Sequence, residues 1–230
     1  MIESIVAWAD VHMPNVVYLW EDLWESVVQT LIMLGIAGAF SLVLGVLLGI
    51  LLVVTADGGL YAHPVFHSAL SKIINVFRSL PFVILIALLV PVTRYLVGTS
   101  IGIRGTILPL VLGIIPFMSR LVEQALADVD PGVIEMAQSM GLSRRYIVLH
   151  VLLKESLPGL TRALVTTTIS LLGLTTMAGA VGGGGGGSFA IRYGYNRFMN
   201  DITLVTVVIL LIFVNVIQGI GNLIIKKLTH

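Results

Sequence analysis

One stretch of this sequence constrains the fold more than any other: residues 26–56 contain no charged side chain. A helix of about 20 consecutive apolar residues is long enough to cross the hydrocarbon core of a bilayer. The whole chain has a mean hydropathy of +1.03 and is 11% charged, whereas soluble domains carry about 25% charged residues. The sequence therefore predicts an all-α integral membrane protein.

The apolar segments predict five transmembrane helices in a single domain that covers residues 1–230. The expected spans are 26–56, 78–97, 105–126, 161–181 and 202–225. Residues 61–76 are expected to form an interfacial helix that leads into the second span. Prolines interrupt the second and third spans, and such breaks are tolerated where the freed backbone faces protein or a wet cavity.

The basic residues indicate the orientation, because loops on the cytoplasmic side of a membrane carry an excess of Lys and Arg. With five spans, nine of the 13 basic residues fall on the side of the C-terminus and four on the other side. The pattern therefore predicts an N-terminus outside and a C-terminus in the cytoplasm. The first 25 residues carry five carboxylates and no Lys or Arg, so they are not expected to be a signal peptide.

The polar segment between the third and fourth spans predicts two short cytoplasmic helices within residues 130–153. Asp130 is expected to cap the first helix with Pro131 at its first position, and Gly141 to close it in a left-handed conformation. Ser143 is expected to cap the second helix. The inward-facing side chains of that helix are predicted to be Ile147, Val148, Val151 and Leu152.

The first of these helices carries an apolar stripe that must be buried against something. The stripe consists of Val133, Ile134, Met136, Ala137 and Met140. It could lie on the membrane surface or on the protein's own bundle. Alternatively, it could insert into a groove on a cytosolic partner.

The same segment resembles the cytoplasmic coupling motif of the permease subunits of ABC importers. That motif begins with Glu-Ala-Ala, has a Gly four residues after the last Ala, and continues with apolar positions and a Pro. The matching positions are Glu135, Ala137, Gly141, Val151 and Leu153. Met136 replaces the first Ala, and Lys154 stands where the Pro is expected.

Other segments resemble the methionine branch of this family. They are residues 77–82, 91–94, 97–102, 116–117, 177–182 and 193–195. The resemblance implies the type I importer fold and a permease that moves D- or L-methionine across the bacterial cytoplasmic (inner) membrane by alternating access. It also implies three kinds of partner: ATPase subunits, a substrate-binding lipoprotein and a second copy of the chain in a homodimer.

The chain itself is not expected to be an enzyme or to hold a cofactor. It has no Walker sequence for ATP, and in the family ATP is hydrolysed by the partner subunit. The glycine run of residues 182–187 lacks the Lys that such a sequence requires, so we expect a flexible turn there. The resemblance implies instead close backbone packing near an outer gate.

The predicted site residues form two groups. Those for coupling to the ATPase are Glu135, Ala137, Gly141, Arg144 and Arg145. Those for a gate or translocation path are Met177, Asn215, Gln218 and Asn222. The last three share one helical face, and hydrogen bonding between helices is the alternative role for them. Core packing is the alternative role for Met177. Arg120 and Glu123 are expected to form an ion pair.

Two other functions stay open at this point. One is a permease for another amino acid or a small peptide in the same superfamily. The other is an ion-coupled secondary transporter, which is disfavoured because the deep parts of the spans carry no carboxylate or His. The chain has no Cys and its five His are scattered, so no metal site is expected, and it has no basic cluster for nucleic acid.

Overall fold

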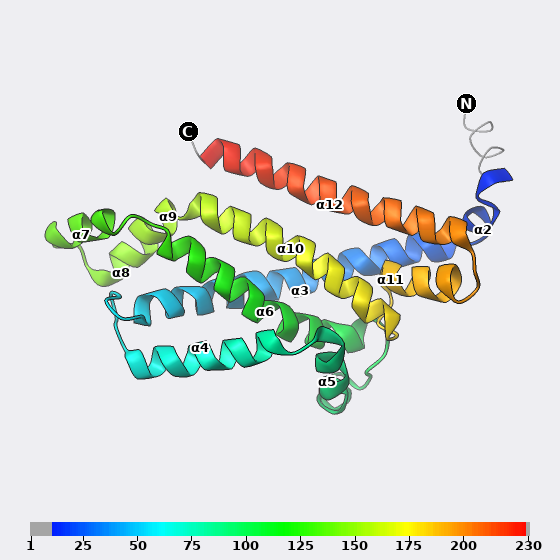
Figure 1. Cartoon of the computed structure of the whole chain (residues 1–230), viewed down its shortest axis with the longest axis horizontal. Coiled ribbons are helices and arrows are strands. Elements are labelled where there is room, and N and C mark those ends of the chain that lie inside the picture. The colour runs from blue at the N-terminus through cyan, green and yellow to red at the C-terminus, as the bar shows by residue number, and fades with distance from the viewer. Residues whose placement is uncertain (1–10, 229–230) are drawn as a thin grey trace. The chain divides into compact units, whose positions relative to one another are not determined.

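The structure is a computed structural model that describes residues 11–228, and within this range it contains helices and connecting turns but no strand (Figure 1). The longer elements are α3 (Trp20–Thr55), α4 (Pro64–Ser79), α5 (Phe82–Val97), α6 (Gly102–Ala127), α10 (Leu157–Ala180) and α12 (Asn200–Leu228). The shorter ones are α2 (Pro14–Tyr18), α7 (Pro131–Ser139), α8 (Arg144–Tyr146), η1 (Ile147–Leu152), α9 (Leu153–Glu155), α11 (Gly185–Phe189) and η2 (Ala190–Tyr195), of which η1 and η2 are π-helical turns. Predictions that concern the first ten and last two residues lie outside the described range.

Within residues 11–228, four helical stretches are long and apolar enough to cross a membrane: α3, α6, residues 157–195 and α12. Helices α4 and α5 qualify only as a pair, which raises the number of candidate spans to five. Each of the four begins a few residues before the predicted span. Helix α6 continues through Pro109 and Pro116, so these two residues do not end the span.

The predicted second span is divided at Leu80 and Pro81. Helix α4 ends at Ser79, and Leu80 adopts an extended backbone with ψ of 127°. A proline disfavours the helical conformation of the residue before it, because its ring collides with that residue's backbone. Residues 64–79 are therefore a separate helix, in the region where an interfacial helix was expected, and α5 starts only at Phe82.

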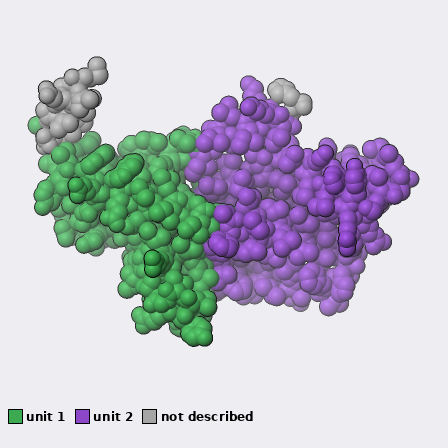
Figure 2. Space-filling view, turned by 180° about the vertical axis from the view of Figure 1, so that it is seen from behind, with its two compact units in different colours: residues 1–38, 82–110, 169–216 green, residues 39–81, 111–168, 217–230 purple. Residues whose placement is uncertain are grey.

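The chain divides into two compact units, which Figure 2 shows in different colours. Unit 1 contains residues 1–38, 82–110 and 169–216, and unit 2 contains residues 39–81, 111–168 and 217–230. The long helices α3, α6, α10 and α12 each contribute residues to both units. Each unit is therefore assembled from segments that are far apart in the sequence.

Two glycines in α3 allow close packing against α6 within unit 2. A Cβ atom at Gly45 would collide with the side chain of Met118. At Gly49 it would lie 2.6 Å from Cβ of Val122 and 2.9 Å from the carbonyl oxygen of Ser119. This Gly-x-x-x-Gly pair therefore lies in a close contact between two helices. The same packing buries Met118 and Val122 in the core of unit 2.

Arg120 connects α6 to α4 within unit 2. Its guanidinium donates to Glu123 at 2.7 Å, which confirms the expected ion pair. It also donates to the hydroxyl of Ser71 at 2.6 Å and to the side-chain carbonyl of Asn75 at 2.9 Å. A charged side chain in an apolar environment needs such partners. The network fastens α4 to α6, two helices that are labelled in Figure 1.

One core cluster of unit 1 gathers α2, the start of α3, the segment α11–η2 and the start of α12. Its buried members are Val16, Leu23, Phe189, Tyr193 and Ile202. Asp201 fixes α2 to α12, because its carboxylate accepts from the backbone N–H and from the side-chain amide of Asn15, both at 3.0 Å.

Large apolar side chains remain exposed along the long helices. On α3 they include Phe40, Val43 and Leu47, and on α12 they include Leu204, Leu211 and Leu223. A soluble monomer rarely exposes apolar side chains over such lengths. Lipid or another protein chain must therefore cover these faces.

Substitution of Gly49 tests the packing of α3 on α6. We expect Gly49→Ala to lower the thermal unfolding temperature of the purified protein, because the new methyl group meets a backbone oxygen that cannot move away. Overpacking of this kind costs about 1–3 kcal/mol. Gly35→Ala is the control in the same helix, because a Cβ there has no neighbour within 4 Å. Equal unfolding temperatures for the two variants would contradict the assignment.

Candidate functional site

The segment between α6 and α10 is built as two capped helices, as the sequence predicts. The Asp130 carboxylate accepts from the backbone N–H of Gly132 at 2.8 Å, and Pro131 occupies the first helical position of α7. Gly141 has φ of +76°. Its N–H donates to the carbonyl of Gln138 at 2.9 Å. These contacts satisfy backbone groups at both ends of α7.

The second part of the segment starts at Ser143, whose hydroxyl accepts from the backbone N–H of Tyr146 at 3.3 Å. The chain then passes through α8 into the π-helical turn η1, where Ile147, Val148 and Leu152 are buried. The expected inward face of this helix is confirmed for these three side chains.

The predicted coupling residues differ in their exposure. Glu135, Gly141, Arg144 and Arg145 are exposed, and the Arg144 guanidinium lies 5.7 Å from the ring centre of Tyr61. Ala137 is only 4% exposed. It therefore faces the rest of unit 2 and is not accessible to a partner protein.

Met136 of α7 and Met140, the residue that caps its C-terminal end, were expected on the same stripe as Ala137, but both are exposed. Met136 is 60% exposed and Met140 is 71% exposed. They are four residues apart and so share one face of the helix. The apolar stripe is thus split, with Ala137 facing the protein and the two methionines facing outward.

A hollow of about 440 Å³ lies beside α7 in unit 2. Asp57, Gly58 and Gly59 from the turn after α3 border it, together with Glu135 and Gln138 from α7. The carboxylates of Asp57 and Glu135 have no ion-pair partner among residues 11–228. The hollow therefore presents two carboxylates, and that of Glu135 lies on α7 next to Met136 in the sequence.

The glycine run in unit 1 differs from the flexible turn that was expected. Gly185, Gly186 and Gly187 are buried and begin α11. The N–H of Gly185 donates to Oε1 of Gln29 at 2.8 Å, and the N–H of Gly186 donates to Oγ1 of Thr30 at 2.9 Å. The run is therefore a closely packed element that α3 holds by hydrogen bonds, and close backbone packing is what the resemblance implies.

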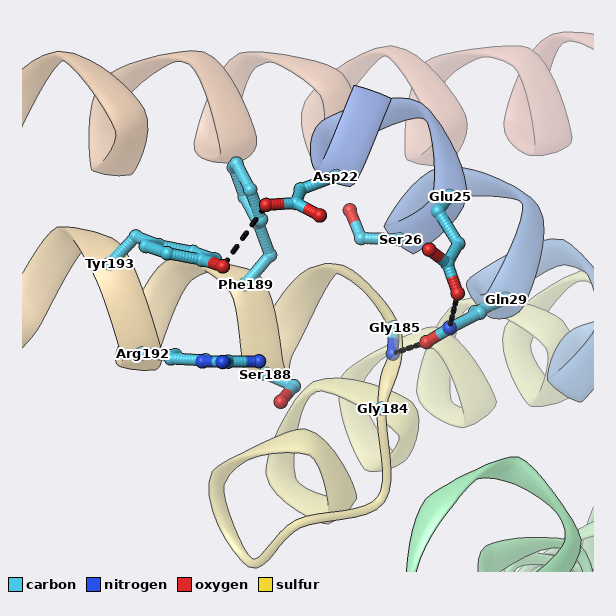
Figure 3. Close-up of a pocket in the computed structure, with 10 residues that line it drawn as sticks. All are labelled: Asp22, Glu25, Ser26, Gln29, Gly184, Gly185, Ser188, Phe189, Arg192 and Tyr193. Carbon is cyan, nitrogen blue, oxygen red and sulfur yellow. Dashed lines mark hydrogen bonds between the residues drawn. The ribbon is translucent and has the colours of Figure 1, made fainter. Parts of the chain in front are cut away.

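A small polar pocket of about 130 Å³ lies next to this run (Figure 3). One wall is a single face of α3 and the other comes from the glycine run, α11 and η2. The lining residues are Asp22, Glu25, Ser26, Gln29, Gly184, Gly185, Ser188, Phe189, Arg192 and Tyr193. Both carboxylates accept hydrogen bonds from neutral side chains: Asp22 from the Tyr193 hydroxyl at 3.0 Å, and Glu25 from the Gln29 amide at 2.9 Å.

Two arginines lie close to the ring of Tyr193. The guanidinium of Arg197 is 4.9 Å from the ring centre, and that of Arg192 is 5.2 Å away. A cation at such a distance is attracted by the aromatic ring when it lies over the ring face. Tyr193 therefore joins the acidic start of α3 to Arg192 of η2 and to Arg197, which follows η2.

The predicted path residues are accessible in the single chain. Met177 is 50% exposed, and Asn215, Gln218 and Asn222 are exposed on α12. The amide of Asn215 donates to the carbonyl of Leu211 at 2.8 Å in its own helix. Met177 and Asn215 belong to unit 1, whereas Gln218 and Asn222 belong to unit 2.

The sequence agrees with a known family over most of its length. Residues 41–230 match the family model described as the binding-protein-dependent transport system inner membrane component. The chain is 44% identical to the probable D-methionine transport system permease protein MetI of Vibrio cholerae. The match extends over 202 residues, which are 88% of this chain and 90% of that protein. It is also 44% identical to the methionine import system permease protein MetP of Bacillus subtilis. This match extends over 203 residues, which are 88% of this chain and 91% of that protein.

The fold agrees with solved structures of the same kind. Two crystal forms of the MetNI methionine ABC transporter, both in inward-facing conformations, match with TM-scores of 0.86 and 0.88 at 40% identity, over 95% of this chain and 99% of theirs. This similarity confirms the type I ABC importer permease fold. An amino acid ABC transporter at 15% identity, with a TM-score of 0.76, shares the fold. The chain therefore belongs to the family of binding-protein-dependent transport system inner membrane components, as a multi-pass permease.

Proposed function

We propose that this chain is the permease subunit of an ATP-driven importer that carries methionine, as the D- or L-isomer, into the bacterial cytoplasm. The names of the relatives at 44% identity support methionine as the cargo. The observation that carries the coupling role is the capped segment of α7, with Met136 and Met140 exposed on its outer face. A second copy of the chain and a substrate-binding lipoprotein complete the proposed importer.

ATP is hydrolysed by a separate ATPase subunit that docks on residues 130–153. The chain supplies no Walker sequence of its own. Met136 and Met140 insert into an apolar groove of that subunit, because flexible methionines adapt to the shape of a partner surface. Glu135, Arg144 and Arg145 surround them with charge, which favours one docking orientation over others.

Ala137 and Gly141 act indirectly in this proposal. The side chain of Ala137 is small and buried, and it allows α7 to lie close to the rest of unit 2. Gly141 ends α7 with a left-handed backbone and so sets the direction of the following segment. A movement of the ATPase would reach the spans through this packed helix.

The translocation path in this proposal runs along faces that are open in the single chain. Met177 lies near the predicted outer end of α10, and Asn215, Gln218 and Asn222 form a weakly polar line on α12. Amide groups in the bilayer can hydrogen-bond a passing amino acid without the cost of a buried charge. Half of the Met177 surface is free to close the path.

Transport follows from two arrangements of the bundle, open outward or open inward. A nucleotide state of the ATPase shifts the balance only if it binds one arrangement more tightly than the other. The coupling segment carries this difference in binding energy to the spans. Alternating access therefore needs firm contact at residues 130–153 but no chemistry within the bilayer.

Reconstitution tests the proposed function as a whole. The chain is combined in liposomes with the ATPase that copurifies with it and with the corresponding binding protein, and uptake of radiolabelled methionine is measured with and without ATP. We expect ATP-dependent uptake that unlabelled methionine inhibits. Uptake that needs an ion gradient and no ATP would favour a secondary transporter. ATP-dependent uptake of a different amino acid would change only the cargo.

Reversal of the charge at Glu135 tests the docking surface. We expect Glu135→Lys to abolish ATP-dependent uptake, because the exposed carboxylate then becomes a cation facing the same partner. Membrane insertion should be unchanged, since Glu135 has no ion-pair partner in the described chain. Lys154→Glu, an exposed charge reversal just beyond the segment, is the control. Normal uptake by Glu135→Lys would remove this residue from the proposed interface.

The two exposed methionines provide a second test. We expect the double variant Met136→Gln, Met140→Gln to bind the ATPase at least about tenfold more weakly, because it loses two apolar anchors. Binding is measured by titration of the ATPase onto the permease in detergent. The unfolding temperature of the permease alone should not change, since both side chains are mostly exposed. Unchanged affinity would show that α7 docks by another face.

A further inference from the structure

The glycine turn, defined as residues 182–187, has a fixed shape in which the six positions differ. Gly182, Gly184 and Gly185 have φ of +93°, +84° and +74°, a region in which glycine avoids the steric cost that other residues incur. Gly186 has no such φ, and a Cβ there would lie an ordinary 3.6 Å from Oγ1 of Thr30. The run is therefore a specified backbone path with one replaceable position.

Helix α3 holds the glycine turn through two consecutive side chains. Oε1 of Gln29 accepts from the N–H of Gly185, and Oγ1 of Thr30 accepts from the N–H of Gly186. Thr30 is buried, and its hydroxyl proton is donated to the carbonyl of Ser26 at 2.9 Å. These two amides have no helical partner of their own, so they depend on α3.

The glycine turn also packs directly on backbone from α10 and on α6. A Cβ at Gly187 would collide with the backbone of Thr176. At Gly183 it would lie 2.6 Å from the hydroxyl of Thr106, which itself bonds the Gly183 carbonyl at 3.4 Å. All these contacts lie within unit 1. The turn is thus attached on three sides inside one compact unit.

We propose that Gln29 and Thr30 are positioning residues that make the glycine turn and the first half of α3 a single rigid body. The turn then moves with α3 when the outer end of the path opens and closes. It does not act as a separate flap. This inference rests on the proposed function, because it assigns a mechanical role to the predicted outer side of the importer.

The physical reason is the burial of the two amides. Gly185 and Gly186 are buried. If the turn left α3, their N–H groups would lose the acceptors that the described chain gives them, and a buried polar group without a partner costs free energy. Movement of the two elements together avoids this loss. The acceptors on α3, Gln29 and Thr30, therefore keep the glycine turn from separating from α3 when the outer end of the path opens.

A disulfide between the two elements tests the proposal, and the chain helps because it contains no cysteine. The variant carries Thr30→Cys and Gly186→Cys, with each single variant as its control. A Cβ at Gly186 would lie 3.6 Å from Oγ1 of Thr30, so the side chains of cysteines at these two positions meet and can form a disulfide. The complete complex in liposomes is oxidised, checked for the cross-link by mass spectrometry, and assayed for methionine uptake before and after reduction.

We expect the cross-link to form and ATP-dependent uptake by the oxidised sample to equal or exceed that of the reduced sample, because the disulfide replaces the link that the Thr30 hydroxyl makes in the original protein. Loss of uptake on oxidation with recovery on reduction would show that the turn must leave α3, which overturns the proposal. Failure of the cross-link to form would also overturn it, since the two positions would then not stay in contact.

A matched pair at Thr30 tests the role of the hydroxyl. Thr30→Val keeps the shape but removes the acceptor for Gly186, whereas Thr30→Ser keeps the acceptor. We expect Thr30→Val to lower the amount of methionine taken up per ATP hydrolysed severalfold, with Thr30→Ser close to the original protein. Equal transport per ATP in both variants would contradict the role of Thr30.

The two tests separate this inference from the proposed function. If the unmodified complex takes up no methionine, the proposed function fails, and the formation of the cross-link still reports on the contact between α3 and the turn. If the unmodified complex transports methionine and the oxidised variant does not, only the rigid-body inference fails.

Discussion

Hydrogen bonding of the backbone inside a bilayer is the constraint on which this structure depends. No water is available there, so an N–H or C=O group must find its partner within the protein. Helices α3, α6, α10 and α12 satisfy this requirement internally. The glycine turn is not helical at its start, and its amides are satisfied instead by Gln29 and Thr30. Two uncharged polar side chains of α3 thus satisfy the first backbone amides of α11, a segment far away in the sequence.

The features that the sequence predicted well are governed by local rules. The long apolar stretches required helices, and the caps at Asp130, Gly141 and Ser143 follow from side chains and backbone angles within a few residues. The ion pair of Arg120 with Glu123 lies within one turn of helix. Such contacts need no knowledge of the rest of the fold, and the structure contains each of them.

The features that the sequence did not predict depend on segments distant in the chain. The spacing of Gly45 and Gly49 is common in apolar helices, and only the position of α6 shows that both contact it. Periodicity placed Met136, Ala137 and Met140 on one broad stripe, but it could not tell which part of the stripe faces unit 2. The glycine turn looked flexible because its acceptors lie 156 residues away in sequence. Burial and exposure at these places are properties of the assembled fold.

The glycine turn also restricts how this protein can evolve. Three of its positions require a backbone angle that other residues adopt at a steric cost, and Gly183 and Gly187 lack space for a side chain. Gly186 is the position at which a small residue fits without moving its neighbours. Among related sequences, we therefore expect residue 186 to vary before the other five positions of the turn. Changes at Gln29 or Thr30 would persist only when another acceptor for the same amides arises nearby.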